Sequence, residues 1–329
     1  MNPSRPIPEV LWEHVRAAPR IDVDRVRSVS PSRLSSELAA MGLALSDRDE
    51  LVTRWGDVLA SDAWVRLLAG LWAVVEEQRG RPDDPVLIVR DLDETGVVGR
   101  LLFLYLAGLA ASGTRDFLIS EGFPSDVIVD TLATVARHAA VHRRQFGTSG
   151  LSAGWWIMLA LRGDLVNIGS LQYHRLRLGI GTLSPSPWYP PEEADVRGVG
   201  FRWGDPVVGL HIPDGADLSE GAVDQSLGQA RDLLQRTWPA PHRRLVTCQS
   251  WIFDPHLADI LGSESRLLRF ARRFTLVPGE VVGDHDVREF VLRPHAGGPT
   301  RLQESVIRLL DSGRHWSTRT GWMSWESTE

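Results

Sequence analysis

One stretch of the sequence joins a proton-transferring side chain to a potential anion site. An apolar segment, predicted as a strand over 207–212, contains His211, and Gly215 follows in a turn before a helix predicted over 219–237. The free N–H groups at a helix start bind anions, and a glycine lets a ligand approach the backbone. An imidazole exchanges protons near neutral pH. The same pattern also fits an ordinary strand-to-helix connection, capped by a polar side chain of the turn.

A second group of reactive side chains follows on the next predicted strand, over 244–253. Alternation along a strand places Cys248 and Ser250 on one face and Trp251 on the other. A thiol or hydroxyl there could belong to a catalytic site. Cys248 fits equally well as a small buried hydrophobic residue.

Two further motifs have the residues of a catalytic site but the wrong surroundings. Residues 150–154 match G-x-S-x-G, whose serine needs a preceding strand to hold it on a strained turn, whereas a helix is predicted before Ser152. His138 and His142 have a metal-binding spacing on a helix, but arginines surround them and no glutamate lies between them. We therefore interpret Ser152 as a helix cap and the two histidines as a solvated helix face, and expect no metal.

Composition excludes several classes of chemistry. The 329 residues contain no lysine, because all 36 basic residues are arginine, so a Schiff-base or P-loop lysine is absent. A single cysteine allows no intramolecular disulfide. The net charge of −6 and the lack of a basic block argue against nucleic-acid binding.

Hydropathy indicates a cytoplasmic protein. Residues 1–20 lack the apolar core of a signal peptide. The most apolar segment, 97–111, is short for a membrane span and contains Arg100. We expect it to be a buried helix, with no membrane partner.

The periodicity of apolar residues changes near residue 165. Helical spacing dominates before it, with caps predicted at Ser46 and Ser61 and a long helix opened by Pro124 and closed by Gly147. After it, alternation predicts strands separated by short helices. The fold class is therefore α/β (α+β), with a helical domain over 1–165 and a mixed-sheet domain over 166–329.

The second half is expected to contain both hairpins and crossover helices. Residues 166–178 are predicted as one strand, or as two strands with a kink near Gly169. The strands are predicted over 166–178, 199–203, 207–212, 244–253, 276–282 and 314–323, and the helices over 219–237, 255–261, 264–274, 284–290 and 301–310.

A series of short motifs over about 95–325 gives the sequence a family resemblance. These are Gly122-Phe123-Pro124, Asp130-Thr131-Leu132, Arg162-Gly163-Asp164, Gly169-Ser170-Leu171-Gln172-Tyr173, His211-Ile212-Pro213-Asp214-Gly215, Cys248-Gln249-Ser250-Trp251 with Asp254-Pro255, Gly313-Arg314-His315-Trp316 and Gly321-Trp322. In order and spacing they resemble the bacterial acyltransferases built from an acyltransferase N-terminal domain and a GNAT-like C-terminal domain. The resemblance implies acyl transfer without naming a substrate.

By this resemblance, an acyl thioester, acyl-CoA by default, lies between the strands 207–212 and 244–253. The backbone N–H groups near Leu210 and Ile212 would face its carbonyl, and Gly215 and Gly221 would lie near its phosphates. Trp251 is a further candidate contact for the donor. The acceptor would be an amine of a small molecule or peptide.

The resemblance also suggests the acid–base groups. His211 and His174 are the candidate bases, and Cys248 or Ser250 the candidate proton donors to the leaving thiolate. The family pattern often has an acidic residue where this chain has His174.

The donor loop departs from ordinary GNAT enzymes. Residues 214–220 lack the Q/R-x-x-G-x-G/A phosphate signature and contain three acidic residues instead. Acidic groups stabilise a helix N-terminus but disfavour a pyrophosphate there. A carrier-protein thioester therefore remains an alternative donor. A non-catalytic GNAT-like binding domain, or a serine hydrolase using Ser152, remains an alternative function.

Overall fold

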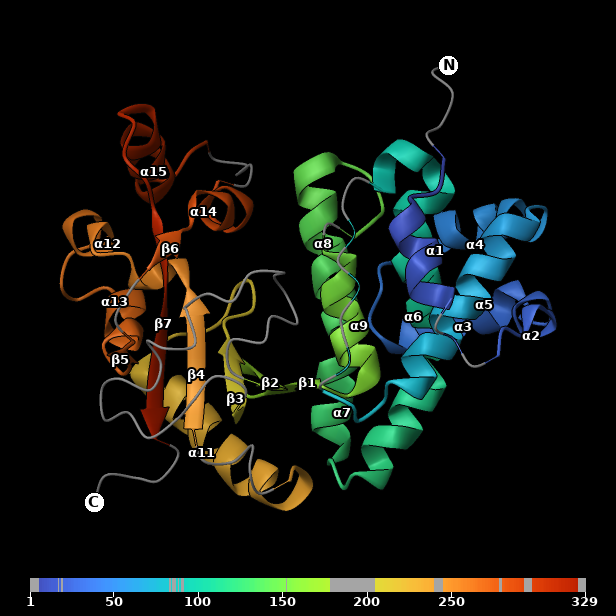
Figure 1. Cartoon of the computed structure of the whole chain (residues 1–329), viewed down its shortest axis with the longest axis horizontal. Helices are drawn as coiled ribbons and strands as arrows, with labels where there is room; N and C mark the ends of the chain where they lie inside the picture. The colour runs from blue at the N-terminus through green and yellow to red at the C-terminus, as the bar shows by residue number, and fades with distance from the viewer. Residues whose placement is uncertain are drawn as a thin grey trace. The chain divides into compact units, whose positions relative to one another are not determined.

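The computed structural model describes residues 6–16, 18, 20–82, 84, 87, 89, 92–151, 153–177, 205–239, 245–277, 280–292 and 298–324. The chain divides into two compact units, 1–166 and 167–329. The first is built of helices and the second around a sheet, as the sequence predicts (Figure 1). The predicted strand 199–203 lies outside the described residues.

The first unit packs its helices around α6. Its elements are α1 (Glu9–Arg16), α2 (Val23–Arg27), α3 (Pro31–Ala40), α4 (Leu45–Leu59), α5 (Asp62–Glu77), the 3-10 turn η1 (Leu92–Thr95), α6 (Val97–Ser120), α7 (Ser125–Leu132), α8 (Thr134–Phe146) and α9 (Gly154–Arg162). α6 is long and apolar enough to span a membrane, but 72% of its apolar window is buried against protein. It is therefore the core helix of this unit.

Helix starts and stops follow local signals with two exceptions. Ser61 caps α5 by accepting a hydrogen bond from the backbone N–H of Trp64, as predicted. The cap predicted at Ser46 is wrong, because α4 begins one residue earlier, after Ala44, without a side-chain cap. The long helix predicted from Pro124 is interrupted between α7 and α8.

A guanidinium accounts for this interruption. Arg137 donates from Nη2 to the backbone carbonyl of Asp130, at 2.6 Å, and from Nη1 to its carboxylate, at 2.8 Å. The carbonyl that would accept the next helical hydrogen bond therefore has a charged donor instead.

The second unit contains a seven-stranded sheet of order β1-β2-β3-β4-β7-β5, with β6 also pairing with β7. Its elements are β1 (Leu165–Ile168), β2 (Leu171–Arg177), β3 (Pro206–His211), α11 (Glu220–Thr237), β4 (Leu245–Ser250), the 3-10 turn η3 (Trp251–Phe253), α12 (His256–Ile260), α13 (Arg266–Ala271), β5 (Thr275–Leu276), β6 (Val281–Val282), α14 (Asp284–Phe290), α15 (Arg301–Asp311) and β7 (Ser317–Ser324). Of the two alternatives for residues 166–178, the structure has two strands, because Gly169, with φ of 62°, separates β1 from β2.

Two predicted strands are shorter than expected. The strand predicted over 244–253 ends at Ser250, whose hydroxyl oxygen accepts a hydrogen bond from the N–H of Ile252 and starts the turn η3. The strand predicted over 276–282 is two short strands, β5 and β6, which pair with different parts of β7. In Figure 1, β7 runs beside β4 along its length.

A buried carboxylate fastens the end of β4 to β7. Asp254 accepts hydrogen bonds at Oδ2 from the backbone N–H of Ser317, at 2.5 Å, and from its hydroxyl, at 2.9 Å. Its Oδ1 accepts from the backbone N–H of His256, at 2.7 Å, and lies 2.8 Å from the Nδ1 of that ring. The whole side chain of Asp254 is buried. Its loss would leave several buried donors without an acceptor.

We predict that Asp254→Ala destabilises the protein by about 3 kcal/mol, because unsatisfied buried donors cost about 1–3 kcal/mol each. Thermal unfolding should show a Tm lower by roughly 6–12 °C. The control Asp259→Ala, at an exposed position of α12, should change stability by no more than about 0.5 kcal/mol. Equal effects of the two changes would contradict this role of Asp254.

Candidate active site

The central feature of the site is the way β3 meets its two neighbours. β3 pairs antiparallel with β2 along its whole length, from Pro206 to His211. With β4 it is parallel, and the described residues pair only at Val208–Val246 and Gly209–Thr247. β4 itself continues to pair with β7 as far as Ser250. The two strands are therefore joined at their starts, and their ladder ends before either strand does.

The strand registers place the candidate residues on two opposite faces of the sheet. Because paired residues project to the same side, His174 shares a face with Gly209 and Thr247. Alternation then places His211 on that face as well. The opposite face contains Val208 and Val246, and by alternation Cys248 and Ser250.

Both candidate histidines come together on the first face. Their ring centroids lie 5.6 Å apart, with His174 fully buried and His211 half-buried. Gly209 lies directly opposite His174, and its lack of a side chain leaves room for the neighbouring side chains of β2. A Cβ at Gly209 would lie 2.4 Å from Leu176 Cδ2 and 3.4 Å from His174 Cβ. The diagonal pairing of neighbouring strands thus joins two histidines that are distant in sequence.

Desolvation determines the charge of His211. The protein surrounding its ring lowers its pKa from the ordinary value of about 6.5 to about 3. The imidazole is therefore neutral at neutral pH. The expectation that His211 exchanges protons near neutral pH is therefore wrong, because burial penalises the charged form of the ring.

The candidate proton donors lie elsewhere. Cys248 is a buried free thiol on the face opposite the histidines, and burial raises its pKa to about 12. An acid this weak is poorly matched to a thiolate with an ordinary pKa of about 8.5. Ser250 caps the turn η3, and the carbonyl of Trp251 accepts a hydrogen bond from the indole of Trp316. These arrangements favour structural roles for all three residues.

The start of α11 has an open backbone, but an acidic side chain already accepts hydrogen bonds there. Gly215 has φ of 75°, and no atom lies within 4 Å of an added Cβ at Gly215 or Gly221. Asp217 accepts hydrogen bonds from the N–H and hydroxyl of Ser219, which lower its pKa. Arg266 lies 3.4 Å from Asp217 and offsets part of its charge.

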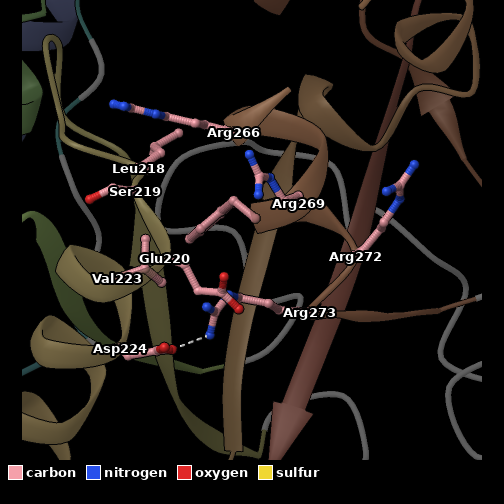
Figure 2. Close-up of a pocket in the computed structure, with 10 residues that line it drawn as sticks. Leu218, Ser219, Glu220, Val223, Asp224, Arg266, Arg269, Arg272 and Arg273 are labelled. Carbon is pink, nitrogen blue, oxygen red and sulfur yellow. Dashed lines mark hydrogen bonds and ion pairs between the residues drawn. The ribbon is translucent and has the colours of Figure 1, made fainter. Parts of the chain in front are cut away.

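A basic cavity that sequence reasoning missed lies beside this helix start. It encloses about 540 Å³ and is lined from α11 and α13 (Figure 2). Its lining residues are Leu218, Ser219, Glu220, Val223, Asp224, Arg266, Arg269, Phe270, Arg272 and Arg273. The signal in the sequence is the arginine-rich segment 266–273. It is separated from α11 by a strand and two short helical segments, so its proximity is not apparent from spacing.

The G-x-S-x-G motif is not on a nucleophile elbow. Helix α8 ends at Phe146, and residues 147–151 form no strand before Ser152, which itself lies outside the described residues. The strained strand–turn–helix that a serine hydrolase needs is therefore not formed by the part of the motif that the structure describes. The described residues also contain no group of three or more His, Cys, Asp or Glu that could hold a metal.

Comparison with known families divides the chain in the same way as its fold. An N-acyltransferase N-terminal domain matches residues 32–163, and a GNAT-like C-terminal domain matches residues 165–323. The chain therefore belongs to the acyltransferases that combine these two domains, and it is an acyltransferase. The alternatives of a non-catalytic binding domain and a serine hydrolase are not supported.

Solved structures of acyltransferases are similar over most of the chain. One, in complex with decanoyl-CoA and teicoplanin, has a TM-score of 0.71 and 27% identity, covering 88% of this chain and 86% of that chain. Another, with CoA and 10C-teicoplanin, has a TM-score of 0.72, 27% identity and the same coverage. A mutant acyltransferase with octanoyl-CoA has a TM-score of 0.71 and 26% identity, covering 87% and 86%. A comparison with curated proteins found no match.

The low pKa of His211 predicts a specific dependence of stability on pH. In the unfolded chain the ring binds a proton as the pH falls through about 6.5, whereas in the folded protein it stays neutral down to about 3. Its contribution to stability is therefore present above pH 6.5 and is lost as the pH falls towards 3. His211→Gln should lose less stability than wild type between pH 7.5 and 5, measured by denaturant unfolding.

The matched control is His285→Gln, at a histidine whose side chain is 55% exposed. It should retain the pH dependence of the wild type. A ring proton of His211 that titrates near pH 6.5 by NMR would contradict the account.

Proposed function

We propose that this protein transfers an acyl group from acyl-CoA to an amine of a small molecule or peptide. The observation that supports it most is the ladder between β3 and β4, which ends at Gly209 and Thr247 while both strands continue. An extended thioester arm can add along such backbone edges as an extra strand would. The acyltransferases of similar fold that bind decanoyl-CoA and octanoyl-CoA support acyl-CoA as the donor.

In this proposal the thioester carbonyl lies at the end of β3, near Leu210 and Ile212. A backbone N–H there would stabilise the oxyanion that forms when the amine attacks. The C–N bond forms, the C–S bond breaks, and the coenzyme A thiolate takes up a proton. Proximity supplies much of the rate, so few side chains are needed.

His211 would accept the proton of the acceptor amine. Its neutral ring can accept a hydrogen bond from the amine N–H, and attack makes that nitrogen cationic and its protons much more acidic. A weak base is then sufficient to remove one. His174, 5.6 Å away between ring centroids, is the candidate to orient the ring of His211.

The reprotonation step is proposed to use water. Cys248 and Ser250 project to the opposite face from the histidines, and the high pKa of Cys248 makes it a poor donor. This assignment departs from the one that the family resemblance suggests for these two residues.

For the acceptor, we expect acylation of a free amine, and teicoplanin is the first compound to test, because a protein of similar fold binds it. The protein would be incubated with decanoyl-CoA and teicoplanin, and the product identified by mass spectrometry with fragment mapping of the modified atom. Release of coenzyme A without an acylated product, or acylation at a hydroxyl group, would contradict an amine acceptor.

Donor binding and turnover should respond to different residues. Gly215→Val forces a branched side chain into a left-handed conformation and should weaken acyl-CoA binding by about tenfold or more, measured by calorimetry. His211→Ala should lower kcat by about 10²–10⁴-fold with little change in donor affinity, because it removes a general base.

Two controls separate these effects from loss of folding. Gly228→Val adds the same side chain to α11 at a helical position where a Cβ meets no atom within 4 Å, and His285→Ala removes an exposed histidine. Neither should alter donor affinity or kcat by more than about twofold. If Gly215→Val and His211→Ala behave like these controls, the site is misplaced.

A further inference from the structure

The basic cavity between α11 and α13 has more positive than negative side chains in its lining. Four arginines line it against two carboxylates, Glu220 and Asp224. Its volume of about 540 Å³ lies within the range of about 300–1,000 Å³ that is usual for small-molecule sites. Leu218, Val223 and Phe270 add an apolar surface beside the charges. The lining therefore suits an anionic ligand with an apolar part.

Ion pairs with acidic residues already involve two of these arginines. Arg273 lies 2.5 Å from Asp224, as the dashed line in Figure 2 shows. Arg266 lies 3.4 Å from Asp217, in the loop before α11. These contacts hold α13 against the start of α11 and partly neutralise the acidic residues near the helix start.

Arg269 has a different environment. Its Nη2 donates to the backbone carbonyl of Glu264, at 3.0 Å, and within the described part of the chain it has no carboxylate partner. A guanidinium has five N–H donors, so most of its donors remain available. In Figure 2 its side chain lies between those of Arg266 and Arg272, and the nitrogen end of Arg272 extends away from α11. Arg272 likewise donates to a backbone carbonyl, that of Ser263, and has no carboxylate partner in the described part of the chain. Arg269 is therefore the centrally placed one of the two arginines that no acidic residue neutralises.

The fold explains why this charge lies near the donor. A parallel connection from β3 to β4 needs a crossover, and α11 provides it. The helix therefore starts at the edge of the sheet where β3 ends. The loop at that edge lacks the phosphate signature of ordinary GNAT enzymes and contains acidic residues, which disfavour a phosphate there. Positive charge from another element would therefore favour binding of the donor.

We propose that α13 supplies the positive charge that the donor loop lacks, and that Arg269 binds the 3′-phosphate of coenzyme A. This rests on the function proposed above. A phosphate monoester has about two negative charges and three acceptor oxygens, which suit the donor fork of a guanidinium. The 3′-phosphate lies at the end of coenzyme A furthest from the thioester. An exposed arginine such as Arg269 can reach that end of the donor.

The test measures the affinity of the full-length protein for decanoyl-CoA and for 3′-dephospho-decanoyl-CoA by calorimetry. Wild type should bind decanoyl-CoA about tenfold more tightly than 3′-dephospho-decanoyl-CoA, because one charge-assisted hydrogen bond contributes about that much to the affinity. Arg269→Gln should lose this preference by weakening the binding of decanoyl-CoA alone. The control Arg308→Gln removes an exposed arginine of α15 that pairs with Glu304, and it should retain the preference.

Each other outcome has a defined meaning. Equal affinity of wild type for both donors overturns this inference and leaves the proposed function intact. Equal weakening of both donors by Arg269→Gln assigns the arginine to the pyrophosphate and also overturns it. Absence of binding of either donor to wild type overturns the proposed function itself. Circular dichroism of each variant checks that the fold is retained.

Discussion

The arrangement of the second unit depends on one feature, the early end of the ladder between β3 and β4. Each strand is held on its other side by an antiparallel partner, β2 or β7, so both remain extended after they stop pairing with each other. Backbone groups along this gap are available to a ligand. The parallel connection also requires α11, which puts a helix start at the same edge. One strand pairing thus positions the proposed thioester slot and the proposed phosphate site.

Burial then determines which chemistry each side chain can do. Desolvation keeps His211 neutral and the thiol of Cys248 protonated. The first effect is useful to a group that accepts a hydrogen bond from an amine, and the second makes a thiol inert. In the proposed donor site the arginines of α13 meet the acidic start of α11 at the surface of the unit. In the proposed mechanism the interior of the unit orients the reactants, and the arginines at its surface attract the donor.

Much of this fold can be predicted from the sequence, because the signals are local. Alternation predicts the strand region of β1 and β2, and Gly169 indicates where it can divide. Residue types also predict the strand, turn and helix around Gly215. The relation between neighbouring strands is not local. Alternation shows that Cys248 and Ser250 share a face, but only the register with β3 shows that His211 lies on the other. Arg269 was missed for the same reason, since tertiary packing alone brings α13 to α11.

Hydrogen–deuterium exchange of the full-length protein with and without decanoyl-CoA tests the central claim most directly. If the donor lies along the separated edges of β3 and β4, amides in peptides covering 207–213 and 246–251 should exchange more slowly when it is bound. Protection confined to residues 1–166, with both of these peptides unchanged, would contradict the account.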